Sequence, residues 1–276
     1  MLPLFKLFFP VFMVVASILG VESVNPASQL ARIESVNPGF VRWNGVRWPD
    51  QVDHTQLAAL NNLETTKVIV VVQTTEFIPT TIQQYQIGMY IKNLAIQYPY
   101  IYAWELWNEP DRPAFYGSSY FLGGGWNTDA RGYGAFLSRV KYLNPENTIL
   151  SGGLCEANVS WVSTMLTYAG KPDGISFHSY ATYPYANTLD IQNKVVRLRS
   201  LTTIPLYLTE TALKVSDPAP ADFDAKKAEY LQAVFTTATD LKLWSAIWYT
   251  VGGNGWMNTD LEGLSYDLFR ELTNAQ

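Results

Sequence analysis

One segment of the chain, residues 101–111, reads IYAWELWNEPD and carries the signals that decide the fold. Its apolar and aromatic side chains alternate with others as in a buried β-strand. A period of two places on one face Ala103, Glu105, Trp107 and Glu109. Ionised side chains are costly to bury unless they are paired or used. A strand that ends in Asn108 and Glu109 therefore indicates a site where charge is required.

Strand-like segments recur along the whole chain. They are residues 17–25, 40–48, 67–74, 101–108, 147–153, 174–180, 204–210 and 244–250. Stretches with helical spacing of apolar residues lie between them, for example 53–66, 80–99, 131–143 and 221–241. Eight strands that alternate with helices over about 250 residues predict a single-domain α/β protein, a (β/α)₈ TIM barrel. A doubly wound open sheet is the alternative, but no Gly-rich nucleotide fingerprint follows the early strands.

The residues that end the strands are the candidates for a site, because barrel enzymes place their active sites there. Residues 204–210 end in Glu210, which a period of two places on the face of Leu206 and Leu208. The side chains expected at the mouth are Asn108, Glu109, His178, Tyr180, Glu210 and Trp248. Glu105 lies deeper and requires a cationic partner, for which Arg42 is the candidate.

Two carboxylates across an aromatic pocket, with imidazole, hydroxyl and amide groups beside them, suit the hydrolysis of glycosidic bonds. One carboxyl group protonates the leaving oxygen, while the other attacks the sugar or activates water. In enzymes that retain the anomeric configuration the two groups lie about 5–5.5 Å apart. Glu109 and Glu210 are the predicted pair.

These segments resemble, in chain order, those of clan A glycoside hydrolases, and the similarity is nearest to families 39 and 5. WELWNEPD (104–111) resembles their strand-four motif, and PLYLTETAL (205–213) resembles the strand-seven motif with the nucleophile. SFHSY (176–180) and IWYT (247–250) are similar to strands six and eight. FVRWNGVRW (40–48) is similar to the strand-two segment with an active-site arginine.

The resemblance implies a retaining β-glycosidase in which Glu109 is the acid/base and Glu210 is the nucleophile. Arg42 is then expected to keep Glu210 ionised, since a nearby cation lowers the pKa of a carboxyl group. Glu109 requires a raised pKa, which partial burial and repulsion from Glu210 are expected to supply.

The resemblance also implies residues that bind the substrate. Asn108 is expected to hold the sugar 2-hydroxyl, Tyr180 to orient the nucleophile, and His178 to line the subsite beside it. Trp248 is the expected stacking platform for the sugar. Trp126, in the long loop after residue 111, and Trp256, in VGGNGW (251–256), are expected to form walls of the cleft.

Composition excludes several other classes of function. The net charge is −5 and no Lys/Arg cluster occurs, which argues against nucleic acid as a partner. The single cysteine, Cys155, excludes an internal disulfide and a Cys-rich metal site. With only His54 and His178, a metal-dependent hydrolase is not favoured, and no metal or other cofactor is expected. We expect a monomer with a carbohydrate substrate; a catalytically inactive carbohydrate-binding barrel is the alternative.

The N-terminal residues 1–16 form a hydrophobic, signal-like or anchor segment, and residues 17–276 form the barrel. A secreted or cell-surface location is therefore predicted, with attachment to a membrane through residues 1–19 as an option. The first strand overlaps this segment, so cleavage near residue 20 would remove half of it. An uncleaved anchor, cleavage near Val15 and Ala16, and a longer leader remain open.

Overall fold

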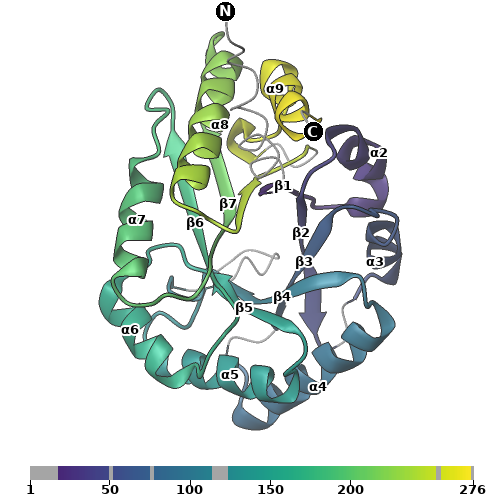
Figure 1. Cartoon of the computed structure of the whole chain (residues 1–276), viewed down its shortest axis with the longest axis vertical. Coiled ribbons are helices and arrows are strands. Elements are labelled where there is room, and N and C mark those ends of the chain that lie inside the picture. The colour runs from purple at the N-terminus through teal and green to yellow at the C-terminus, as the bar shows by residue number, and fades with distance from the viewer. Residues whose placement is uncertain (1–17, 50–51, 75–77, 114–123, 253–255, 275–276) are drawn as a thin grey trace, which may run out of the picture.

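A computed structural model describes residues 18–49, 52–74, 78–113, 124–252 and 256–274 (Figure 1). Helices surround a ring of parallel strands, so the predicted (β/α)₈ barrel is confirmed. No helix among the described residues is long and apolar enough to span a membrane. The predicted signal-like segment, residues 1–16, lies outside the described residues, and export of the chain stays a prediction.

The strands form one parallel sheet that closes on itself. They are β1 (Leu19–Glu22), β2 (Phe40–Trp48), β3 (Lys67–Thr74), β4 (Ile101–Asn108), β5 (Thr148–Gly153), β6 (Ile175–Thr182), β7 (Leu206–Lys214) and β8 (Ser245–Trp248). Their order in the sheet is β5-β4-β3-β2-β1-β8-β7-β6. Bridges from Leu150 to Gly174 and from Leu154 to Phe177 join β5 to β6. This closure excludes the open doubly wound sheet.

The helices cover the outer face of the strands. They are α2 (Pro26–Val36), α3 (His54–Leu60), α4 (Thr81–Gln97), α5 (Ala130–Leu143), α6 (Val159–Tyr168), α7 (Leu189–Arg199), α8 (Phe223–Asp240) and α9 (Gly263–Asn274). Polar side chains fix where several begin: Asp53 accepts from backbone N–H groups at the start of α3, and Thr80 and Gln83 form a capping box on α4. These caps satisfy N–H groups that have no partner within the helix.

The interior of the barrel is layered. An apolar cluster contributed by six of the strands fills the lower part: Phe40, Ile69, Ala103, Leu150, Tyr207 and Ile247. Two positions further along β2 and β4 lie Arg42 and Glu105, which are both fully buried. The apolar cluster therefore supports a charged layer directly above it, on the side where the strands end.

Candidate active site

The end of β4 has an unusual backbone that brings two neighbouring residues into the site. Trp107 has φ of 80° and Glu109 has φ of 46°, values that are costly for residues with a side chain. The prediction that Trp107 shares the inner face is wrong, because it packs edge-on against Trp126, with ring centroids 5.8 Å apart. The left-handed turn at Trp107 instead directs Asn108 into the barrel, where its Oδ1 accepts a hydrogen bond from Arg42.

Glu210 reaches the barrel interior by a different route from the predicted one. Leu206 and Leu208 pack in the core beneath the helices, so the face assigned to β7 by a period of two was wrong. The register of β7 against β8 shifts between Leu208 and Thr211. An irregularity of this kind re-aims one side chain, and it turns Glu210 inward at the mouth.

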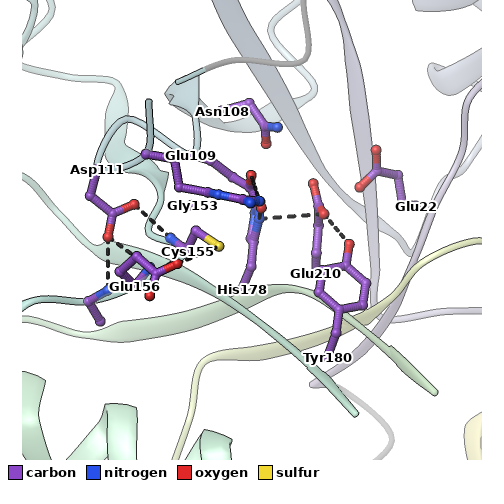
Figure 2. Close-up of polar contacts among 12 residues, drawn as sticks. Glu22, Asn108, Glu109, Asp111, Gly153, Cys155, Glu156, His178, Tyr180 and Glu210 are labelled. Atoms are coloured by element: carbon purple, nitrogen blue, oxygen red, sulfur yellow. Dashed lines mark hydrogen bonds and ion pairs between the residues drawn. The ribbon is translucent and has the colours of Figure 1, made fainter. Parts of the chain in front are cut away.

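Glu109 and Glu210 face each other across His178, as Figure 2 shows. One oxygen of each carboxylate and a ring nitrogen of His178 all lie within 4.8 Å of one another. Nδ1 of His178 is 3.2 Å from Oε1 of Glu109 and 3.4 Å from Oε2 of Glu210. A β-carbon at Gly153 would lie 1.9 Å from Nε2 of His178, so only glycine leaves room for this ring. The predicted trio is therefore assembled at one point.

Arg42 is the centre of the charged layer, and all five of its N–H donors are used. Nη1 donates to Glu22 and to Glu210, both at 2.6 Å. Nη2 donates to Glu105 at 2.7 Å and to Asn108 at 2.9 Å, and Nε donates to Glu105 at 3.3 Å. The predicted pairing of Arg42 with Glu105 is thus present. Although burial opposes the charge, these carboxylates raise the pKa of Arg42 well above its usual value.

Glu22, at the end of β1, is a member of the site that the sequence analysis missed. Its side chain is 4% exposed and forms an ion pair with Arg42. Burial raises the pKa of Glu22 to about 8, more than attraction to Arg42 lowers it. The rule used for Glu109 and Glu210, a carboxylate at the carboxyl end of a strand, would also have found it.

Tyr180 contacts Glu210 as predicted: its hydroxyl group donates to Oε2 of that carboxylate (Figure 2). Burial, together with the charge of Glu210, raises the pKa of Tyr180 well above its usual value, so the phenol keeps its proton. Its ring lies edge-on to Tyr249, with centroids 6.3 Å apart. Tyr249 is therefore the aromatic residue that β8 contributes next to this site.

The prediction of a raised pKa for Glu109 is wrong. Burial raises it, but the hydrogen bond and charge of His178 and the charge of Arg112, 3.1 Å away, together lower the pKa of Glu109 to about 2. Burial lowers the pKa of His178, but Glu210 and Glu109 outweigh this and raise it. A proton shared by this pair is therefore held by His178 in preference to Glu109.

The expected sugar platforms are part of the core. Trp248 is 1% exposed, donates through its indole N–H to the carbonyl oxygen of Thr259 at 2.9 Å and packs against Tyr230 of α8. Its assignment to the mouth was wrong because the inward residue of β8 is Ile247. Trp126 is fully buried, so it forms no wall of the cleft. The side chain of Trp256 lies outside the described residues.

Asp111, two residues beyond Glu109, shapes the neighbouring loop and was also missed. Its carboxylate accepts backbone N–H groups from the loop after β5, those of Cys155, Glu156 and Ala157, at 2.8–2.9 Å (Figure 2). A cavity of about 640 Å³ opens beside it, between the loops that follow β4 and β5. Its lining includes the first residues of α5 and α6, but none of Glu109, His178 and Glu210.

The same trio has the composition of a metal site, since Glu109, His178 and Glu210 offer ligand atoms close together. Each carboxylate, however, already binds a cationic side chain, Arg112 or Arg42. A further cation would have to compete with these, so the donor set suits a carboxylate pair better than a resident metal.

Comparison with protein-family models gives no match, and comparison with curated protein sequences gives none either. Among solved structures, a GH10 protein from Paenibacillus barcinonensis superposes with a TM-score of 0.67 at 12% identity, over 96% of each chain. The GH53 catalytic domain of Ignisphaera aggregans gives 0.64 at 14% identity, over 94% of this chain and 96% of that one. A GH128 endo-β-1,3-glucanase from Amycolatopsis mediterranei, in complex with laminarihexaose, gives 0.61 at 13% identity, over 92% and 98%. The resemblance to glycoside hydrolase barrels is thus confirmed at the level of the fold, without singling out family 39.

Proposed function

We propose that the protein is a retaining glycoside hydrolase that cleaves β-linked oligo- or polysaccharides. The observation that carries the proposal is the pair of buried strand-end carboxylates, Glu109 and Glu210, with one oxygen of each no more than 4.8 Å from one oxygen of the other. This separation suits the retaining mechanism, with its spacing of about 5–5.5 Å, better than the wider gap of inverting enzymes.

In the first step Glu210 attacks the anomeric carbon. A bond forms between that carbon and a carboxylate oxygen, and the bond to the leaving oxygen breaks. Arg42 and Tyr180 hold the carboxylate in place through hydrogen bonds. The leaving oxygen takes its proton from Glu109.

Glu109 must first receive that proton, because its pKa of about 2 leaves it ionised at neutral pH. His178 is the source, since its Nδ1 lies 3.2 Å from Oε1 of Glu109. As Glu210 loses its charge to the new covalent bond, the attraction that holds the proton on His178 weakens. Transfer to Glu109 then becomes favourable.

In the second step Glu109 acts as a base. It takes a proton from water, whose oxygen attacks the anomeric carbon and displaces Glu210, so the configuration is retained. As Glu210 regains its charge, the proton passes from Glu109 to Nδ1 of His178, and the starting state is restored. We assign the contact with the 2-hydroxyl group of the sugar to Asn108, which precedes Glu109 and accepts a hydrogen bond from Arg42.

One comparison favours a substrate longer than a single sugar. One of the similar structures is an endo-β-1,3-glucanase bound to laminarihexaose. We therefore place β-1,3-glucan first among the substrates to be tested.

The test is a reducing-sugar assay on laminarin, xylan, galactan, mannan and cellulose. Wild type is compared with Glu109→Gln and Glu210→Gln, and Glu146→Gln, a change at an exposed glutamate away from the site, is the matched control. We expect hydrolysis that both site variants lose and the control keeps, with circular dichroism showing that all are folded. Saccharide binding without turnover in wild type would instead identify an inactive carbohydrate-binding barrel.

A further inference from the structure

One nitrogen of Arg42 serves two carboxylates that come from different strands. Nη1 donates to Oε2 of Glu22, on β1, and to Oε1 of Glu210, on β7, at 2.6 Å in both cases. The other N–H groups of Arg42 are held by Glu105 and Asn108. No spare donor of the guanidinium group can replace a bond that Nη1 loses. Any stronger hold on Glu22 therefore weakens the hold on Glu210.

The charges around Arg42 do not balance if every carboxyl group is ionised. One guanidinium faces three carboxylates in a site that excludes water, those of Glu22, Glu105 and Glu210. Burial favours the neutral form of a carboxyl group. It raises the pKa of Glu22 to about 8, so this group holds its proton at neutral pH.

The other groups that face Glu22 are few. Arg42 and Arg47 approach from β2, His178 from β6 and Glu210 from β7. The second neighbour of β1 in the sheet, β8, supplies no charged side chain between Ser245 and Trp248. The shared nitrogen of Arg42 is therefore the main link between Glu22 and the rest of the site.

We propose that Glu22 is a positioning residue for Glu210 and acts through Arg42. While Glu22 is protonated, the positive charge at Nη1 is available to hold Glu210. When Glu22 ionises, it draws Nη1 toward itself, and Glu210 is held less firmly. The role of Glu210 as nucleophile rests on the proposed function, but the electrostatic link between the two carboxyl groups does not.

The link can be measured without any substrate. The protein is labelled with glutamate carrying ¹³C at the side-chain carboxyl, and the resonances are assigned with Glu22→Gln and Glu210→Gln. In a titration from about pH 6 to about pH 10, we expect the Glu22 resonance to move with a midpoint near 8, and the Glu210 resonance to show a step at the same midpoint. Glu22→Gln keeps an acceptor for Nη1 but cannot ionise, so the step should vanish. A Glu210 resonance without a step, or a step that survives in Glu22→Gln, would overturn the proposal.

The second measurement is the pH dependence of kcat/KM on the substrate that the panel identifies. We expect the alkaline limb of the pH profile to lie at least about one pH unit higher in Glu22→Gln than in wild type. Glu22→Ala, which lacks the acceptor for Nη1, should lose activity that Glu22→Gln keeps. An unchanged limb, or a change in KM alone, would show that Glu22 is structural or contacts the sugar, and would overturn the proposal. If no glycan is hydrolysed, the NMR titration alone tests the link between Glu22 and Glu210. A step in the Glu210 resonance without any hydrolytic activity would refute the proposed function but would support that link.

Discussion

Replacing Arg42 by lysine tests whether the guanidinium group holds the charged layer together. Arg42 donates five hydrogen bonds, all in a fully buried environment. Lysine has three N–H donors on a single nitrogen, so at least two of the bonds are lost. A hydrogen bond to a charged group contributes about 1.5–3 kcal/mol, and the loss should therefore be about 3–6 kcal/mol.

The breaking of a buried ion pair gives a similar figure, about 3–5 kcal/mol, because it leaves a carboxylate without compensation. A loss of this size is a large part of the stability of an ordinary domain, about 5–15 kcal/mol. The assay is unfolding in urea at pH 7. Arg270→Lys is the matched control, since that side chain is 51% exposed and should change stability by less than about 0.5 kcal/mol.

The pH dependence of the same loss gives a second check. Burial raises the pKa of Glu22 to about 8 and Arg42 lowers it, so without the guanidinium this pKa rises further. A carboxyl group with a raised folded pKa destabilises the protein as the pH rises above its unfolded pKa, until the folded group ionises as well. Below about pH 8 Glu22 is protonated in both folded proteins, so the difference between Arg42→Lys and wild type should widen as the pH rises above about 8. A loss below about 1 kcal/mol at pH 7, or one that does not grow above about pH 8, would refute the reasoning.

Three further changes have defined outcomes. Gly153→Ala puts a β-carbon into the ring of His178 and should lower activity by at least about tenfold; activity close to wild type would contradict the packing described. Arg112→Gln removes a cation that lowers the pKa of Glu109. Ionised Glu109 then stabilises the folded protein less at pH values above its unfolded-state pKa, so the midpoint of acid unfolding should move to higher pH. An unchanged midpoint would count against that ion pair. Trp248→Phe should lower the thermal midpoint and leave KM unchanged, whereas a rise in KM alone would restore this residue to the sugar site.

The sequence was sufficient for the fold wherever the side-chain pattern is regular. The boundaries predicted for residues 40–48, 67–74 and 101–108 are those of β2, β3 and β4. These strands are long and rich in β-branched or aromatic residues, so tertiary contacts do not override their local preference. The strand-end rule also selected Glu109 and Glu210, which the structure brings together.

Two of the errors share one physical cause, which is that a strict period of two fails at the ends of strands. The left-handed backbone at Trp107 and the register shift before Thr211 each change which face a side chain occupies. Such irregularities depend on contacts with neighbouring strands, and a single strand's sequence does not reveal them. The error at Trp248 is different: Ala246 and Trp248 share a face as predicted, but that face packs in the core beneath the helices.

The bonds of Arg42 also bear on how the chain folds. Its partners Glu22, Glu105 and Glu210 lie 20, 63 and 168 residues away along the chain. The first two can be joined once β1 to β4 have assembled, but the third arrives only when β7 takes its place in the ring. Contacts of such long sequence separation form late and slow the folding of a domain. Docking of the second half of the barrel and completion of the charged layer are thus one event, and a fragment that ends before β7 would bury Arg42 with an incomplete set of partners.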